Sequence, residues 1–171
     1  MTTSSKTPIL LRRRRNALSA NVSSDSDLGA AHSTTGWAAG IVGAGAVHSW
    51  GSKKQATVAI NTQHAEIIAG SEAACELVSE RGILGEIGFV QTKPTLLKMD
   101  NTSAIDLAND PMYHSKAKHI ARRDLFIREL IEHGEIRTEY IKTSLNIADA
   151  LTKPLTKQAF LAHRAALMGH L

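Results

Sequence analysis

The sequence predicts an α/β fold in which a five-stranded mixed sheet is flanked by helices. Short β-type runs separated by glycine occupy residues 17–60, and a helical pattern without breakers then covers residues 64–86. Farther along, strand-like runs at 95–99 and 135–142 alternate with helical segments. Three strands before the first helix and single strands after it are typical of a mixed sheet.

The first part of the chain has the pattern of antiparallel strands. The predicted strands are 17–24, 37–42 and 47–50, followed by a further β-rich segment at 56–60. Gly43-Ala44-Gly45 is the predicted turn after the second strand, because glycine adopts the positive φ that tight hairpins use. The β-branched Thr57 and Val58 favour the last segment, and residues 52–55 form a polar, basic connection before it.

The first helix is predicted over residues 64–86, with Thr62 as its N-cap. One stripe at helical spacing carries Glu66, Gly70, Ala73, Leu77 and Leu84. A carboxylate on a stripe of small and apolar residues is unusual, which makes Glu66 a candidate functional residue. The alternative is a partly exposed acid near the helix start, where it interacts favourably with the helix dipole.

A second acid follows the next predicted strand. Residues 95–99 end directly before Asp100, and Asn101-Thr102-Ser103 then offers N-cap candidates for a helix over 104–109. A strand that delivers an aspartate directly before a helix is a frequent geometry of functional sites in α/β sheets. The alternative for Asp100 is an ordinary turn or capping aspartate.

A basic amphipathic helix is predicted over residues 114–133. Its candidates for contacts with nucleic-acid phosphates are Lys116, Lys118, His119, Arg122 and Arg123. The alternative is a charged face that is merely solvated. After the strand at 135–142, a helical segment begins at Ile147 and carries Asp149, and a last amphipathic helix spans 158–169.

Length and charge fit one domain preceded by a short tail. The chain has 171 residues, a net charge of +4 and a sequence pI of about 9.4, which permits a polyanionic partner. Residues 1–20 are the predicted basic leader and residues 21–171 the folded domain. The run Arg12 to Arg15 is either a nuclear-import or phosphate-binding patch or part of a disordered, solvated tail.

Cysteine content and hydropathy indicate a soluble, intracellular protein. Cys75 is the single cysteine, so no intramolecular disulfide can form, and it is expected to be a small buried residue. No apolar run approaches the roughly 20 residues of a membrane span, and the N-terminus has no signal-peptide pattern. No membrane partner is expected.

Several stretches of the chain resemble the ribonuclease H domain at the C-terminal end of Ty1/copia-type retrotransposon polyproteins. These stretches are 33–37, 49–50, 52–55, 65–73, 100–105, 118–120 and 146–155. The last of them contains an Ala-Asp-x-Leu-Thr-Lys-Pro-Leu element that is highly specific to this family. The resemblance covers roughly residues 23–171 and implies a ribonuclease H-like fold.

The resemblance further implies a metal-dependent endonuclease that hydrolyses the RNA strand of RNA/DNA hybrids during reverse transcription. The catalytic and metal-binding acids of the family map onto Asp25, Glu66, Asp100 and Asp149. Carboxylate oxygens suit Mg²⁺, and two such ions are implied, with Mn²⁺ as a substitute. The implied partners are the hybrid and the reverse transcriptase portion of the same polyprotein, in a cytoplasmic virus-like particle or the nucleus. No small-molecule cofactor is implied.

Alternatives to this interpretation remain open. Asp27 competes with Asp25 for the first position, because residues two apart point to the same side of a strand. The chain is shorter than is usual in the family between Asp27 and Ser33, and Leu28 stands where a tryptophan is usual. A decayed or co-opted domain that binds nucleic acid without cleaving it is the second hypothesis. A transposase or integrase of the same superfold ranks last, because that site usually finishes with a glutamate rather than an aspartate.

Overall fold

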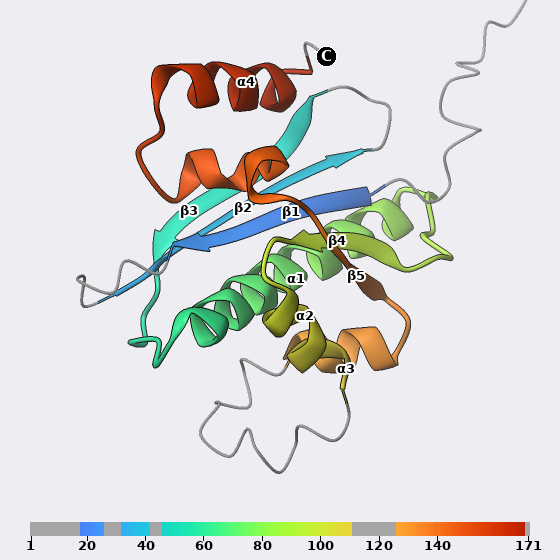
Figure 1. The fold of residues 1–171 in the computed structure, drawn as a ribbon. Coiled ribbons are helices and arrows are strands. Elements are labelled where there is room, and N and C mark those ends of the chain that lie inside the picture. Colours follow the sequence, from blue (N-terminus) through green and yellow to red (C-terminus); the bar gives the residue numbers. More distant parts are fainter. Residues whose placement is uncertain (1–17, 26–31, 42–45, 111–125, 170–171) are drawn as a thin grey trace, which may run out of the picture.

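Five strands form one mixed sheet, as the sequence predicts, and their order in the sheet is β3-β2-β1-β4-β5 (Figure 1). The computed structural model describes residues 18–25, 32–41, 46–110 and 126–169, and of residues 18–25 and 41 it describes the backbone alone. The strands are β1 (Leu18–Asp25), β2 (Thr34–Ile41), β3 (Val47–Lys54), β4 (Thr95–Met99) and β5 (Ile136–Tyr140).

Two kinds of pairing give the sheet one edge at which three strands end together. β1 pairs antiparallel with β2 from Leu18 opposite Ile41 to Asp25 opposite Thr34. On its other side β1 runs parallel to β4, and β4 runs parallel to β5. The carboxyl ends of β1, β4 and β5 therefore lie at the same edge of the sheet, where functional side chains of α/β sheets commonly gather.

The helices lie on both faces of the sheet. They are α1 (Thr62–Glu86), α2 (Thr102–Asn109), α3 (Phe126–Glu132) and α4 (Lys157–Leu167), with short 3₁₀ turns η3 (Thr143–Leu145) and η4 (Ile147–Leu151). Figure 1 shows α1, α2 and α3 on one face and η4 with α4 on the other. None of the helices in the described ranges is long and apolar enough to cross a membrane.

The core lies between the sheet and α1. Its fully buried side chains include Ile67 and Leu77 of α1, Leu97 and Met99 of β4, and Ile127 of α3. Of the predicted helical stripe, Glu66, Gly70, Ala73 and Leu77 are buried, while Leu84 is half-buried. A side chain at Gly70 would meet Ile127 Cδ1 and Met99 Cε at 3.1 Å, so this glycine lets α1 approach its neighbours closely.

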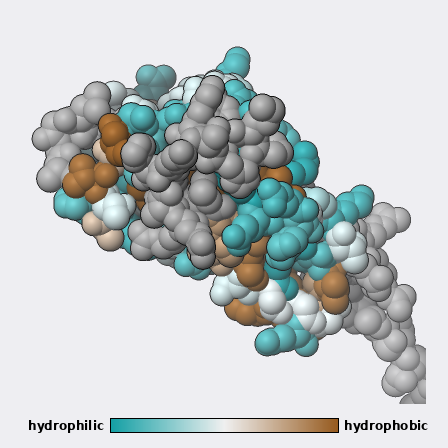
Figure 2. All heavy atoms as spheres, turned by 90° about the horizontal axis from the view of Figure 1, so that it is seen from below, coloured by the Kyte–Doolittle hydropathy of each residue, from teal (hydrophilic) through white to brown (hydrophobic). Residues whose placement is uncertain are grey.

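The described surface below α1, α2 and α3 is mainly hydrophilic. In Figure 2 hydrophobic side chains occur there as separate spots between hydrophilic ones, as far as the described residues form that face. Such isolated apolar side chains are normal on a soluble domain.

Two predictions about the first part of the chain are wrong. Residues 56–60 form no strand, and β3 instead continues through Ser52, Lys53 and Lys54, which the sequence assigns to a connection. These three residues pair with residues 34–36 of β2. The chain leaves the sheet at Gln55, so the β-branched residues after it have no partner strand and their propensity is not realised.

The cap of α1 is Asn61 rather than the predicted Thr62, and its side chain accepts a hydrogen bond from the backbone N–H of His64 at 2.8 Å. The predicted helix over 114–133 is confirmed for its described part, α3, whereas residues 111–125 lie outside the described residues. Residues 1–17, with the arginine run, also lie outside them. β1 begins at Leu18, three residues before the predicted start of the folded domain at residue 21. The division into a leader and a domain stays a prediction.

Candidate active site

Asp100 lies at the carboxyl end of β4 and is half-buried. The residue that caps α2 is its neighbour Asn101, whose side chain accepts a hydrogen bond from the N–H of Ala104 at 3.0 Å. Asp100 is therefore not the capping aspartate that the sequence left open as an alternative. Its carboxylate is available for another role at the edge of the sheet.

Asp149 reaches this region because η4 crosses the sheet at close range. The side chain of Ser52 donates a hydrogen bond to the carbonyl of Leu151 at 2.6 Å, which ties η4 to β3. A Cβ at Gly36 of β2 would lie 2.5 Å from Thr152 Cγ2 and 3.1 Å from the carbonyl of Ala148. Glycine is thus required here for η4 to lie against β2. In this position Asp149 is 4% exposed.

Asp100 and Asp149 interact electrostatically. Burial is the main cause that raises the pKa of Asp100 above its ordinary value of 3.8, and the negative charge of Asp149 raises it further. A hydrogen bond from the Thr143 side chain and the positive charge of Lys153 act in the opposite direction. A carboxylate such as Asp100, whose ionised form is disfavoured by burial and by a neighbouring acid, is the kind of group that a bound cation would stabilise.

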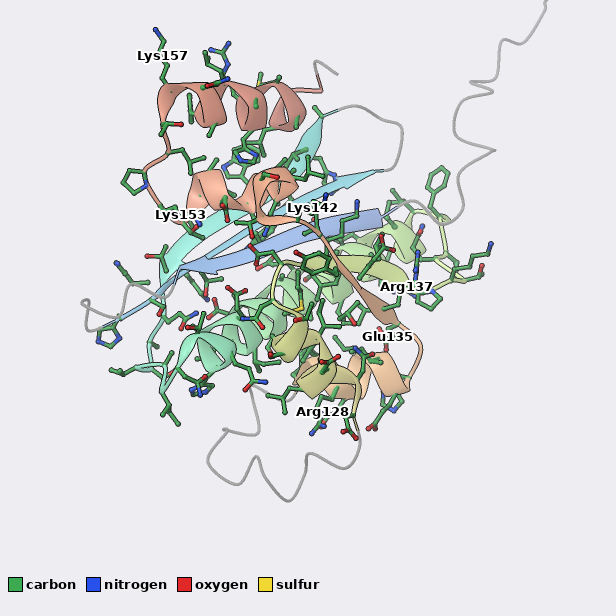
Figure 3. All side chains as sticks on the ribbon, in the orientation of Figure 1. Arg128, Glu135, Arg137, Lys142, Lys153 and Lys157 are labelled. Atoms are coloured by element: carbon green, nitrogen blue, oxygen red, sulfur yellow. The ribbon has the colours of Figure 1, made fainter. Side chains whose placement is uncertain are left out.

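Lys153 forms an ion pair with one member of this pair. Its Nζ lies 3.0 Å from Oδ2 of Asp149, which is four residues earlier in the chain. Lys153 follows η4 on the face of the sheet opposite α1 (Figure 3). Neither family motif nor composition assigned it a role, although a lysine four residues after an acid is a recognisable sign of an ion pair.

Glu66 is buried, with 3% of its surface exposed, and so is not the partly exposed acid of the alternative interpretation. The start of α1 is joined to the start of α2 by a hydrogen bond from the Gln63 side chain to the carbonyl of Ser103 at 2.7 Å. Gln63 precedes Glu66 by three residues and Ser103 follows Asp100 by three. The segments that carry Glu66 and Asp100 are therefore in direct contact through Gln63 and Ser103.

Gln55 holds the first hairpin against α1. Its side-chain nitrogen donates to the carbonyl of Ala65 at 2.9 Å and to the hydroxyl of Thr35 at 3.2 Å. Gln55 is 2% exposed, and its backbone N–H also donates to the carbonyl of Ser33 at 2.8 Å. This network fixes the residue before Glu66 relative to β2, a positioning role that the sequence did not reveal.

Asp25 is the last residue of β1, so its backbone lies at the same edge as Asp100. The side chain of Asp25 and the whole of Asp27 lie outside what the structure describes, and the choice between them stays open. The five basic residues predicted to contact phosphates, Lys116, Lys118, His119, Arg122 and Arg123, also lie outside the described residues.

Carboxylates of the described residues are the candidates for holding a metal ion at this edge. Among the described residues, no group of three or more His, Cys, Asp or Glu side chains is placed to hold a metal ion. The described chain instead brings together a pair, Asp100 and Asp149, with carboxylate oxygens of the kind that Mg²⁺ prefers. The described donor set therefore comprises two carboxylates of a kind that suits a hard divalent cation, and a third acid from Asp25 or Asp27 stays a prediction.

No family model matches the chain. The chain is 37% identical over 112 residues to the retrovirus-related Pol polyprotein from transposon RE1 of Arabidopsis thaliana. It is 39% identical over 116 residues to the retrovirus-related Pol polyprotein from transposon TNT 1-94 of Nicotiana tabacum. The chain is a relative of copia-type retrotransposon Pol polyproteins. The matches cover 66% and 68% of the chain but only 8% and 9% of these polyproteins.

The fold of this Pol-related chain is that of ribonuclease H. The solved structure of ribonuclease H1 from Halobacterium salinarum NRC-1 superposes with a TM-score of 0.51, at 18% sequence identity. The superposition covers 85% of the Pol-related chain and 97% of the archaeal protein. The predicted ribonuclease H-like fold and the resemblance to Ty1/copia-type polyproteins are both confirmed.

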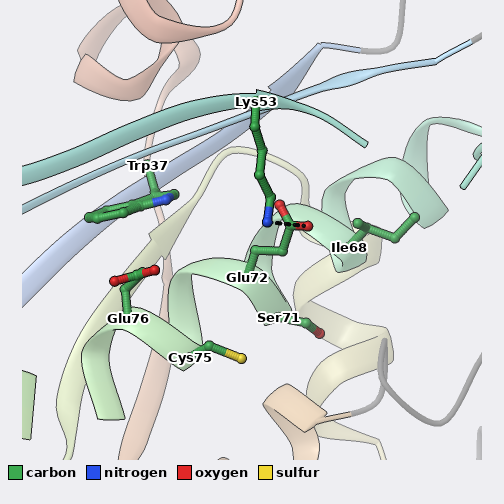
Figure 4. A pocket seen from close by; sticks show the side chains of 7 residues that line it. All are labelled: Trp37, Lys53, Ile68, Ser71, Glu72, Cys75 and Glu76. Carbon is green, nitrogen blue, oxygen red and sulfur yellow. Dashed lines mark ion pairs between the residues drawn. The ribbon is translucent and has the colours of Figure 1, made fainter. Parts of the chain in front are cut away.

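The Pol-related chain has a separate pocket of about 200 Å³ between α1 and the first hairpin (Figure 4). Trp37 of β2 and Lys53 of β3 line it on the sheet side, and Lys53 Nζ lies 3.1 Å from Glu72 Oε1. Cys75 also lines this pocket and is exposed, so the prediction of a buried cysteine is wrong. The reason is that Ala74 and Leu77 occupy the buried side of this turn of α1.

Proposed function

We propose that this chain is a metal-dependent endonuclease that hydrolyses the RNA strand of RNA/DNA hybrids during reverse transcription of a retrotransposon. The observation that carries the proposal is that Asp100 and Asp149 lie near enough for their negative charges to interact, at the edge where β1 and β4 end. Its support is the ribonuclease H fold and the relation to Pol polyproteins.

The proposed site uses four acids in distinct positions. Asp25 and Asp100 are the principal metal ligands, each at the end of a strand. Glu66, buried on α1, serves the leaving-group side and contacts the 2′-hydroxyl, the group that distinguishes RNA from DNA. Asp149, buried on η4, serves the side of the attacking nucleophile.

Mg²⁺ is the proposed cofactor. Two bound ions would supply a nucleophilic hydroxide and stabilise the leaving 3′-oxygen. The chain holds Asp100 and Asp149 near each other on rigid elements. β4, which precedes Asp100, lies between two other strands, and η4, which carries Asp149, contacts Gly36 and is hydrogen-bonded by Ser52. The same burial that raises the pKa of Asp100 makes its ionised form depend on a nearby positive charge.

The hybrid and a reverse transcriptase are the proposed partners. The chain spans less than a tenth of the length of the curated Pol relatives that it matches. We propose that it acts beside the polymerase part of such a polyprotein, in a cytoplasmic particle or the nucleus. The basic residues from Lys116 to Arg123 remain the candidates for gripping the phosphates of the hybrid.

Cleavage of a hybrid with a labelled RNA strand, with and without Mg²⁺, tests this function in three variants. Asp100→Asn and Asp149→Asn should each lower the rate at least ~100-fold, because each removes a charged metal ligand. Asp106→Asn is the matched control, since Asp106 is an exposed aspartate of α2 and its change should leave the rate within about twofold of wild type.

Two results of this experiment would count against the proposal. Undiminished cleavage by Asp100→Asn and Asp149→Asn would show that the acids at this edge are not the site. Binding of the hybrid with strong salt dependence, but without Mg²⁺-dependent turnover by wild type, would instead identify a non-catalytic nucleic-acid-binding domain.

A further inference from the structure

The side chain of Lys153 forms an ion pair with Asp149, one of the proposed metal ligands. Its Nζ lies 3.0 Å from Oδ2 of Asp149, whose side chain is 6% exposed. The Lys153 side chain is itself 33% exposed, so the ion pair is buried on the aspartate side and open to solvent on the lysine side. A pair of this kind is screened less than one on the open surface.

The backbone after η4 folds back on Asp149 and places Lys153 over it. The N–H groups of Thr152 and Lys153 both donate to the carbonyl of Asp149, each at 3.3 Å. The hydroxyl of Thr152 donates to the same carbonyl at 3.2 Å. Pro154 follows and has no N–H with which to extend the turn. The position of Lys153 is thus set by the local chain and not by a chance surface contact.

The charge of Lys153 acts on the pair through its direct contact with Asp149. When no cation is bound, Lys153 therefore supplies part of the positive charge that a divalent cation would bring to this edge of the sheet.

We propose that Lys153 is the resident counter-ion of the Asp100–Asp149 pair and must leave Asp149 for a divalent cation to bind there. This inference rests on the proposed function, because it takes Asp149 as a metal ligand. An ammonium group and a metal ion compete for the same carboxylate oxygen and repel each other nearby. The flexible four-carbon stem of lysine, open to solvent at its end, lets the ammonium group move away. Lys153 thereby lowers the affinity for Mg²⁺ while stabilising the metal-free fold.

Replacing Lys153 separates these two effects. Lys153→Met retains most of the aliphatic stem and removes the charge, while Lys153→Arg retains the charge. Lys157→Met is the control, since Lys157 is an exposed lysine four residues later, at the start of α4. Each full-length variant is unfolded thermally with and without Mg²⁺, and its Mg²⁺ dissociation constant is measured by calorimetry without substrate. Lys153→Gln replaces Lys153→Met if the latter does not fold.

The expected result is a lower Tm for Lys153→Met without metal, together with Mg²⁺ binding roughly 3- to 10-fold tighter than wild type. Lys153→Arg and Lys157→Met should resemble wild type in both measurements. Unchanged or weaker Mg²⁺ binding by Lys153→Met would overturn the proposal. In a separate measurement of hybrid affinity, weaker binding by Lys153→Met with an unchanged Mg²⁺ affinity would also overturn it, because Lys153 would then be a phosphate contact.

Asp100→Asn distinguishes failure of this inference from failure of the proposed function. If Mg²⁺ raises the Tm of wild type but not that of Asp100→Asn, the metal site is supported, and the Lys153 variants decide the role of the lysine alone. If Mg²⁺ stabilises neither protein, or both equally, the proposed metal site is wrong and the role of Lys153 as its counter-ion is wrong with it.

Discussion

At the scale of single residues, the site is a balance between burial and charge. The main cause of the raised pKa of Asp100 is burial, and the charge of Asp149 adds to it. Both effects penalise the ionised carboxylate in the folded protein but not in the unfolded chain. An ionised acid that lowers the stability of the folded protein at neutral pH is typical of a functional site, where a bound ligand balances the charge.

The cost predicts how Asp100→Asn changes stability with pH. A raised pKa means that the folded protein binds this proton more tightly than the unfolded chain, so stability falls as pH rises through the folded-state pKa. Asp100→Asn removes that loss. It should raise the free energy of unfolding of the metal-free protein at neutral pH, and solvent screening of this half-buried group keeps the gain small.

Urea unfolding in a metal chelator measures this gain. The gain should shrink as the pH is lowered toward 3.8, the ordinary pKa of the group, because Asp100 is then protonated in the folded protein. Destabilisation by Asp100→Asn at neutral pH, or the same gain at both pH values, would contradict the electrostatic account.

Residue identities at the site could be predicted where a short motif surrounds them. Asp100 and Asp149 each lie within a family-specific stretch, and the structure shows that they interact. Gln55 and Lys153 also lie within such stretches, 52–55 and 146–155, but the resemblance assigns neither of them a role. Both roles depend on contacts, to Ala65 and Asp149, whose geometry becomes visible only when the chain is folded.

At the scale of elements, the position of Asp149 depends on how closely η4 approaches the sheet. Gly36 of β2 provides the space, and Ser52 of β3 provides a hydrogen bond. The glycine lies in the middle of the sheet rather than in a turn, so its value is the absence of a side chain and not its backbone freedom.

Gly36→Ala should displace η4. The new methyl group would lie 2.5 Å from Thr152 Cγ2 and 3.1 Å from the carbonyl of Ala148, a clash that we expect to cost roughly 1–3 kcal/mol of unfolding free energy. Mg²⁺-dependent cleavage of the hybrid should fall with it, because Asp149 moves with η4.

Gly82→Ala is the control for this change. Gly82 lies on α1 with no atom within 4 Å of an added Cβ, so alanine there should be neutral or stabilise by up to about 1 kcal/mol. Chemical unfolding and the cleavage rate of both variants are the measurements. Equal effects of the two substitutions on stability would show that η4 is not held by close contact with β2.

Element boundaries show where sequence patterns stop being informative. The prediction of a strand over 95–99 has the same first and last residues as β4. The apolar run there begins after Pro94 and ends before Asp100 and the cap residue Asn101. Residues 56–60 were predicted as β-rich from propensity alone, and they form no strand because β3 had already used the available edge of β2. Strand formation depends on a partner that propensity does not specify.

At the scale of the whole molecule, the sheet order brings together acids from distant parts of the chain. β1 and β4 are adjacent and parallel although more than 70 residues separate their starts, so Asp25 and Asp100 end neighbouring strands. The order of elements along the chain predicted this fold. The likeness to ribonuclease H1 of Halobacterium salinarum, at 18% identity, shows that very different sequences adopt this fold.

The most direct test of the central claim is the choice of strand and duplex by the wild-type protein. One sequence is prepared as an RNA/DNA hybrid, an RNA duplex and a DNA duplex, with each strand labelled in turn, and incubated with Mg²⁺. We predict cleavage of the RNA strand of the hybrid alone, abolished by a metal chelator. Intact RNA in the hybrid, or equal cleavage of the DNA duplex, would contradict the account.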